Sequence, residues 1–257
     1  IGQEHVVKTL MNSLRTKSIS HAYLFAGPRG SGKTTIARIF AKTINCENLS
    51  SIEPCNKCDS CHEIMASRSL DLIEIDAASH TSVDNIRELI EGIKFSPVKS
   101  KYKIFIIDEC HQLSKAAANA LLKTLEEPPS HAIFMLATTE VHKMIPTIIS
   151  RCQRVEFKRL QASEIIKKLE FILQKEKIKC EKPALSLIAL NARGSFRDAE
   201  SLLDKCISFT SPAVGEARQG RQDGKITVQE IKDLLGIIEV GQIAQFLDFV
   251  LEKDAKK

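Results

Sequence analysis

Short apolar runs alternate along the chain with longer segments in which apolar residues recur every three or four positions. The first pattern is typical of buried strands and the second of amphipathic helices, so together they predict βα units around a parallel sheet. The predicted strands are 23–26, 72–76, 104–108, 133–138 and 154–157. The predicted helices between them are 33–44, 82–93, 114–125 and 145–150.

After Phe157 the strand pattern ends and only helical spacing remains. We therefore expect a domain boundary near Leu160, with an all-helical module behind it. The helices predicted there are 163–176, 183–191, 195–207 and 226–235, the last with Thr227 as its N-cap.

Two later segments do not fit the helical module. Residues 211–224 are rich in Gly, Pro and charge without an apolar period, which predicts an exposed loop. From Gln242 another amphipathic pattern begins, which we interpret as the first helix of a further domain. The first residue is Ile1 and not Met, so a trimmed fragment is expected.

Composition excludes several classes of protein. With 43% hydrophobic and 27% charged residues, the chain is in the ordinary globular range, which excludes collagen-like and disordered proteins. The apolar run at 104–107 is far too short for a membrane span, so no membrane contact is expected. The excess of 37 basic over 32 acidic residues raises the expectation of a polyanionic partner only slightly.

The eight cysteines are unevenly distributed. Cys46, Cys55, Cys58 and Cys61 lie close together, and the other four are scattered singly. This is typical of a metal site plus ordinary thiols in a reducing cytoplasm, not of a secreted disulfide framework. Four thiolates favour a closed, structural Zn²⁺ site, with iron–sulfur ligation or unligated thiols as the alternatives. His62 is expected to be a bystander.

The segment from Gly27 to Thr34 matches G-x-x-x-x-G-K-[ST] between a predicted strand and a predicted helix. Its glycines let backbone N–H groups surround phosphate oxygens, Lys33 adds a positive charge, and the Thr34 hydroxyl can bind Mg²⁺. This predicts a site for ATP or GTP, and the alternative is a glycine-rich turn. The residues expected to bind the nucleotide are Gly27, Pro28, Arg29, Gly30, Ser31, Gly32, Lys33, Thr34 and Thr35.

Two carboxylates, Asp108 and Glu109, end the strand predicted at 104–108. Parallel strands bring their carboxyl ends to one edge of the sheet, so both acids are expected to face the nucleotide. Asp108 would then hold Mg²⁺ through its water shell, and Glu109 would orient the water that attacks the γ-phosphate. The alternative is that they cap the helix after Ser114.

Eight motifs in chain order carry a family resemblance. They are GQEHV (2–6), HAYLFAGPRGSGKTTIARIFAKTINC (21–46), DLIEIDAAS (71–79), IIDECHQLS (106–114), NALLKTLEEPP (119–129), LATTE (136–140), SRC (150–152) and GSFRDAESLLD (194–204). Together with the cysteine cluster, this set resembles the γ/τ subunits of bacterial DNA polymerase III, the ATP-hydrolysing AAA+ motors of the replicative clamp loader.

The resemblance implies an α/β fold, that of AAA+ P-loop NTPases, with a parallel five-stranded sheet, an inserted zinc module and a following small helical lid. The implied domains are a RecA-like nucleotide-binding domain (1–160, zinc module 46–61), a lid domain (161–237) and the start of a truncated collar domain (238–257). The implied cofactors are ATP, Mg²⁺ and Zn²⁺.

The resemblance also implies roles for three more residues. Thr139 is implied as sensor 1, which reads the γ-phosphate, and Arg197 as sensor 2 on the lid. Arg151 is implied as an arginine finger that enters the ATP site of the adjacent subunit. Without the resemblance, Arg151 would be expected to cap the helix ending at Ser150, and Arg197 to pair with a neighbouring carboxylate.

The implied function is to load the sliding clamp onto primed DNA as a component of the polymerase III holoenzyme, a nucleotidyltransferase complex, without being its polymerising subunit. The implied partners are the δ and δ′ subunits, further γ/τ copies, the sliding clamp and primed DNA, bound mainly through its phosphates.

A helicase is a second hypothesis, because DECH (108–111) and ATT (137–139) imitate helicase motifs. A helicase of that kind needs a second RecA-like domain, however, and the helical residues after Leu160 cannot form one. A non-hydrolysing scaffold like δ′ is a third, although the phosphate loop here is intact.

Overall fold

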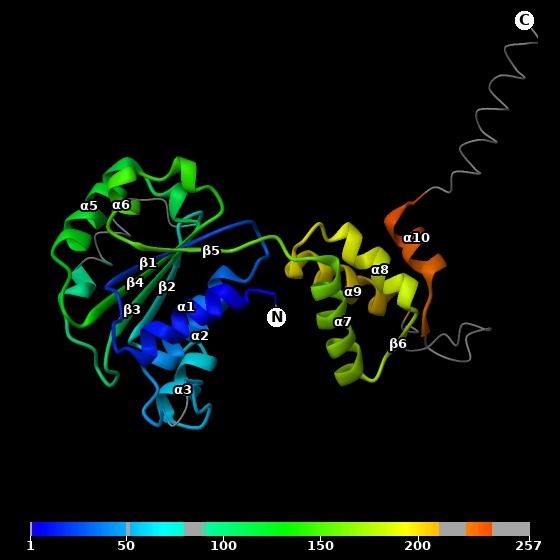
Figure 1. Cartoon of the computed structure of the whole chain (residues 1–257), viewed down its shortest axis with the longest axis horizontal. Helices are drawn as coiled ribbons and strands as arrows, with labels where there is room; N and C mark the ends of the chain where they lie inside the picture. The colour runs from blue at the N-terminus through cyan, green and yellow to red at the C-terminus, as the bar shows by residue number, and fades with distance from the viewer. Residues whose placement is uncertain (1, 50–51, 80–88, 90, 211–224, 238–257) are drawn as a thin grey trace, which may run out of the picture. The chain divides into compact units, whose positions relative to one another are not determined.

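The computed structural model describes residues 2–49, 52–79, 89, 91–210 and 225–237. The chain divides into two compact units, Ile1–Arg159 and Leu160–Lys257 (Figure 1). Most of the predicted helix 82–93, the predicted loop 211–224 and the predicted collar segment 238–257 lie outside the described residues. Within the described ranges, no helix is both long and apolar enough to cross a membrane.

The first unit contains a five-stranded parallel sheet with the strand order β2-β3-β4-β1-β5. Its strands are β1 (Ala22–Ala26), β2 (Leu72–Asp76), β3 (Lys103–Asp108), β4 (Ala132–Thr138) and β5 (Gln153–Glu156). The predicted sheet is confirmed, with strand ends within one residue of the prediction. The three central strands are buried along nearly all of their length, which is why they are continuous apolar runs in the sequence.

Helices cover both faces of this sheet (Figure 1). They are α1 (Glu4–Arg15) and α2 (Lys33–Ile44) on one face, and α5 (Lys115–Glu126) and α6 (Pro146–Ile149) on the other. Successive strand residues point to opposite faces, so Leu24 packs in the cluster that contains α5, and Phe25 in the cluster that contains α2. Helices α2, α5 and α6 were predicted, whereas α1 was not.

The second unit is mainly helical, as predicted. Its helices are α7 (Ala162–Glu176), α8 (Lys182–Asn191), α9 (Phe196–Thr210) and α10 (Val228–Leu235). Thr227 is the N-cap of α10 and forms a capping box with Glu230, which confirms its predicted role. The expectation of an all-helical module is wrong in one detail, because β6 (Lys179–Cys180) and β7 (Lys225–Ile226) form a short parallel pair. Two residues are too few to give a strand pattern.

A buried carboxylate fixes the entry to β3, the strand that carries Asp108. Asp71, just before β2, is only 2% exposed. Its side chain accepts the backbone N–H groups of Val98, Lys99 and Ser100 at 2.7, 2.9 and 2.8 Å. Burial raises the pKa of Asp71, but the three donors stabilise the charged form, and the net pKa lies below its ordinary value. The segment that enters β3 is therefore tied to the start of β2.

Replacing this carboxylate is expected to loosen β3 locally. Asp71→Asn should speed amide hydrogen exchange of residues 98–108 at pH 7 by roughly 30-fold, or about 2 kcal/mol, because an amide NH₂ then faces backbone donors. Since the pKa is lower in the folded chain, the carboxylate's contribution is complete above its unfolded-state pKa of about 3.9 and is lost as pH falls through the folded-state value. Mass spectrometry of deuterium uptake measures the change.

Glu63→Gln is the matched control. Glu63 pairs with Lys99 of the same segment at 2.9 Å, but this ion pair is exposed. It should change exchange by less than about 2-fold. Equal effects of the two substitutions would contradict the role given to Asp71.

Candidate functional site

The phosphate loop joins β1 to α2 and requires glycine at two positions. Gly32, the N-cap of α2, has a φ of +95°, a conformation that other residues rarely adopt. At Gly27 a Cβ atom would lie 2.5 Å from the carbonyl oxygen of Phe157. Ser31 closes the loop by donating its hydroxyl to the carbonyl of Pro28 at 2.8 Å. The loop therefore has a fixed shape that its glycines permit.

Lys33 lies inside this loop at the first position of α2 and is only 5% exposed. Its Nζ donates to the carbonyl oxygens of Gly27 and Pro28, both at 3.0 Å. Burial lowers the pKa of Lys33, and the negative charges of Glu109 and Asp108 oppose that effect. The ammonium is thus held between the loop and the two acids at the carboxyl end of β3.

Thr34 and Asp108 join the loop to the end of β3. The Thr34 hydroxyl donates to Oδ2 of Asp108 at 2.5 Å, and Oδ1 of Asp108 accepts the N–H of Glu109 at 2.9 Å. A hydroxyl and a carboxylate supply the oxygen ligands that Mg²⁺ prefers. The two residues predicted to hold Mg²⁺ therefore lie in contact, and their donor atoms fit that ion.

Glu109 and Thr139 meet across neighbouring strand ends. The backbone of Glu109 is left-handed, with φ 46° and ψ 41°, where it opens the 3-10 turn η1 (Cys110–Gln112). Such a conformation is unfavourable for a residue with a side chain and is found preferentially at functional sites. Thr139, which follows β4, donates its hydroxyl to Oε2 of Glu109 at 2.9 Å. Because β4 pairs with both β1 and β3, the loop, the acids and Thr139 share one edge of the sheet.

The two predicted arginines are not part of this set of contacts, since Arg151 binds other residues of the first unit and Arg197 belongs to the second unit. Arg151 donates to the carbonyl of Thr147 at 2.9 Å, which is the helix-capping contact weighed as its alternative role, and to Oε1 of Glu126 on α5 at 2.8 Å. Its side chain remains 34% exposed. Arg197 is exposed at the second position of α9, in the second unit. Five predicted residues thus converge at the sheet edge: Lys33, Thr34, Asp108, Glu109 and Thr139.

Two residues that contact predicted site residues were not assigned a role from the sequence: Glu126 and His111. Glu126 at the end of α5 binds Arg151, which is 25 positions later in the chain, and sequence spacing does not reveal such a contact. His111 lies two residues after Glu109, and its ring nitrogen Nδ1 is 3.4 Å from Oε2 of that residue. Its position just after Asp108 and Glu109 in the sequence could have indicated that it lies near the site.

The four clustered cysteines form a second candidate site. Their sulfur atoms all lie within 4.8 Å of one another. Tetrahedral Zn²⁺ with Zn–S bonds of about 2.3 Å needs sulfurs roughly 3.8 Å apart, and those of Cys55 and Cys61 are 3.9 Å apart. Cys58 precedes α3 (Asp59–Met65), which was not predicted, and its sulfur accepts the N–H of Cys61. The set fits the predicted Zn²⁺, and His62 is exposed beside it.

The cysteine environments differ. Backbone N–H groups of Lys57 and Cys58 lower the pKa of Cys55 to about 6, whereas burial raises that of Cys61 to about 12. Burial also raises the pKa of each scattered cysteine, which makes them unreactive thiols at neutral pH. These are Cys110, Cys152, Cys180 and Cys206.

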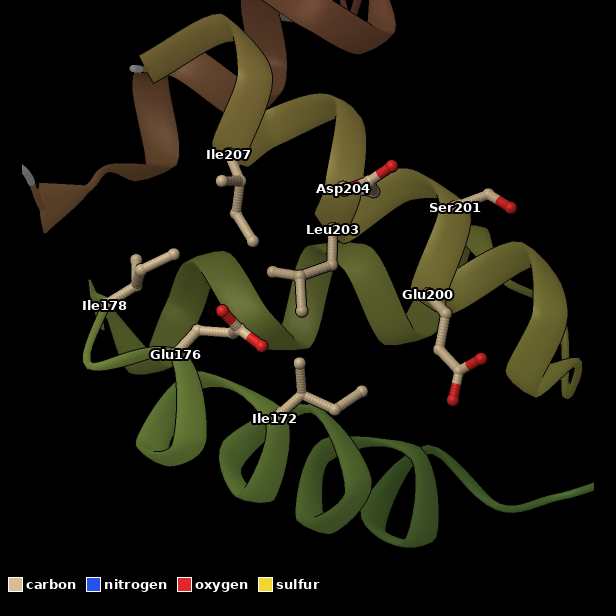
Figure 2. A pocket seen from close by; sticks show the side chains of 8 residues that line it. All are labelled: Ile172, Glu176, Ile178, Glu200, Ser201, Leu203, Asp204 and Ile207. Atoms are coloured by element: carbon tan, nitrogen blue, oxygen red, sulfur yellow. The ribbon is translucent and has the colours of Figure 1, made fainter. Parts of the chain in front are cut away.

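A hollow in the second unit lies between α7 and α9 (Figure 2). Aliphatic side chains of Ile172 and Leu203 face each other across it, and the carboxylates of Glu176, Glu200 and Asp204 lie around them. Oε1 of Glu200 lies 3.6 Å from Nζ of Lys168. None of the residues predicted from the sequence to act on nucleotide lines this hollow.

Comparison with known families matches both units. Residues 2–161 match the family described as "DNA polymerase III, delta subunit". Residues 164–212 match "DNA polymerase III clamp loader subunit, ATPase lid domain".

Solved structures agree on the fold. The branch migration motor RuvB of Thermotoga maritima has a TM-score of 0.65 at 20% identity, over 93% of this chain and 70% of that one. A DNA polymerase III gamma subunit-related protein of the same organism has a TM-score of 0.51 at 22% identity, over 95% and 76%. At these identities the two structures bear on the fold alone. Their TM-scores, together with the match to the ATPase lid domain, confirm the predicted AAA+ architecture.

Curated relatives are much closer in sequence. DNA polymerase III subunit tau of Bacillus subtilis is 54% identical over 82% of this chain and 37% of its own length. Subunit gamma of Buchnera aphidicola subsp. Acyrthosiphon pisum is 43% identical over 100% of this chain and 68% of its own. Tau of Escherichia coli is also 43% identical over 100% of this chain, which spans only 38% of that relative. The chain belongs to the γ/τ family of DNA polymerase III clamp-loader subunits.

Proposed function

We propose that this chain is the ATP-binding and ATP-hydrolysing motor of a clamp-loader subunit, and that the whole protein uses ATP to load a sliding clamp onto primed DNA. The observation that carries the proposal is the convergence of Lys33, Thr34, Asp108 and Glu109 with Thr139 at one sheet edge. We assign residues 1–160 to nucleotide binding, 161–237 to the lid and 238–257 to the start of a collar.

Each side chain at this edge has a distinct task. The loop N–H groups and Lys33 bind the phosphates of ATP, and Thr34 with Asp108 would hold Mg²⁺, which neutralises phosphate charge when bound. Glu109 orients the attacking water as a general base. Thr139 contacts that same carboxylate, so a change at the γ-phosphate can reach Glu109 through one hydroxyl.

Hydrolysis is proposed to depend on assembly. Arg151 is partly exposed and bound to Glu126 on its own chain, a surface ion pair that contributes at most about 1 kcal/mol. A neighbouring subunit's ATP can therefore draw the guanidinium away at little cost, where it would stabilise the charge of phosphoryl transfer. Arg197 is proposed to contact nucleotide from the lid. The partners are further γ/τ copies, δ, δ′, the clamp and primed DNA.

Two alternative functions are separable by assay. A helicase would unwind duplex DNA without the clamp. A non-hydrolysing scaffold would not bind ATP, and the buried Lys33 and formed loop argue against it. Strand displacement and equilibrium binding of a fluorescent ATP analogue by the full-length protein distinguish these outcomes.

Substitutions at the loop and at Glu109 should separate binding from hydrolysis. Lys33→Ala should abolish both, because the phosphates lose their buried cation. Glu109→Gln should keep ATP binding within about 3-fold but lower turnover by at least roughly 100-fold, because the general base is lost. Steady-state ATPase and fluorescent-ATP binding measure this, with the exposed Lys8→Ala as control. Full turnover by Glu109→Gln would remove its proposed role.

Arg151→Ala should lower ATP turnover of the assembled complex by about 10³-fold while ATP affinity stays unchanged, because the cation acts on the developing charge of hydrolysis. The isolated subunit should be unaffected. Arg154→Ala is the matched control, because Arg154 lies three residues after Arg151 and its loss breaks an exposed ion pair with Glu156. If the isolated subunit loses as much activity as the complex, Arg151 does not act between subunits.

Metal analysis tests the cysteine site. The purified protein should hold about one zinc per chain, and Cys58→Ser should lose it and lower the melting temperature, because a structural Zn²⁺ contributes directly to folding. Cys180→Ser, at a half-buried single cysteine, should keep the metal. Iron in place of zinc would support the iron–sulfur alternative, and no metal would leave the cysteines as thiols.

A further inference from the structure

His111 is a buried polar side chain beside the proposed general base. It lies in η1, two residues after Glu109, and its side chain is only 6% exposed. Its Nδ1 lies 3.0 Å from the hydroxyl oxygen of Thr138 and 3.4 Å from Oε2 of Glu109. Its Nε2 lies 3.6 Å from Oε1 of Glu140. The ring therefore stands between two carboxylates and bridges the ends of β3 and β4.

The contact with Thr138 restrains the ring, and the tautomer that suits both neighbours carries its hydrogen on Nδ1. Thr138 Oγ1 accepts the N–H of Glu140 at 3.0 Å and can also accept Nδ1–H of His111, which in this tautomer faces Oε2 of Glu109 with a hydrogen and not with a lone pair. Thr138 itself is fully buried at the last position of β4. A buried imidazole bonded to a buried hydroxyl has little freedom to rotate.

This arrangement makes the two oxygens of Glu109 inequivalent. Oε2 accepts the hydroxyl of Thr139 and faces Nδ1 of His111. In the part of the chain that the structure describes, Oε1 has no hydrogen-bond partner of its own. The backbone of Glu109 is itself in the left-handed conformation.

We propose that His111 is a positioning residue that holds the Oε2 side of Glu109, so that Oε1 receives the attacking water. In that step the water oxygen bonds to the γ-phosphorus and the bond from that phosphorus to the bridging oxygen of ADP breaks. The water proton passes to Oε1. The inference rests on the proposed ATPase function and deepens it, because the base is oriented by a side chain that does not itself touch substrate.

Three substitutions of His111 in the full-length, assembled protein test the proposal. His111→Asn keeps a polar group near the position of Nδ1, His111→Gln keeps one only near Nε2, and His111→Phe fills the space without either. We expect the Gln and Phe variants to lose roughly 10- to 100-fold in kcat with KM for ATP within about 2-fold, because the base is misplaced and phosphate binding is not. The Asn variant should stay within about 3-fold of wild type.

His142→Asn is the matched control, since His142 also lies beside Glu140, at 3.5 Å, but is 76% exposed. It should have wild-type kinetics. An inactive wild-type protein would refute the proposed function itself. An active wild type with full kcat in the Gln variant, or with equal losses in all three variants, would overturn the role of His111 and leave the ATPase intact. If the Phe variant does not fold, the comparison of Asn with Gln still decides.

Discussion

Strand β4 pairs with β1 on one side and with β3 on the other, and the candidate site depends on that double pairing. The phosphate loop leaves β1, the two acids leave β3, and the threonine that contacts Glu109 leaves β4. Because the strands are parallel, all three departures occur at one edge. The register of β1 and β4 aligns the ends of these two strands. Ala26 is opposite Thr138, and the carbonyl of Thr138 accepts the N–H of Gly27 at 3.2 Å.

The contacts at this sheet edge explain how a buried ammonium and two carboxylates lie close together in their charged forms. Lys33 is buried, which disfavours its charged form, but its ammonium has two carbonyl acceptors and faces two carboxylates. The acids in turn are held by hydroxyl and backbone donors. Each charged group therefore has a partner from another element, and the site is ordered by the sheet as a whole.

Much of this was predictable from the sequence because the signals were local. The apolar runs predicted the strands to within one residue, and the loop motif with the acids at the end of the strand predicted which side chains meet at the sheet edge. Where the prediction fell short, the cause was not local. Helix α1 precedes any strand that could indicate a βα unit, and the β6–β7 pair joins segments far apart in the chain. The contacts of His111 and Glu126 depend on turns whose direction only the folded backbone defines.

Gly27 and Phe157 are in contact although the chain between them makes most of the first unit. The approach leaves no room for a side chain at position 27, and Phe157 donates its N–H to Ala26 at 2.7 Å, so the aromatic residue cannot retreat without breaking the β1–β5 edge. Phe157 also stands just before Leu160, where the second unit begins. The atom nearest to a Cβ at position 27 is the carbonyl oxygen of Phe157, which every residue carries, so no change of side chain at position 157 would make room for it. A side chain at position 27 would instead have to displace the backbone of the segment that leads out of the first unit.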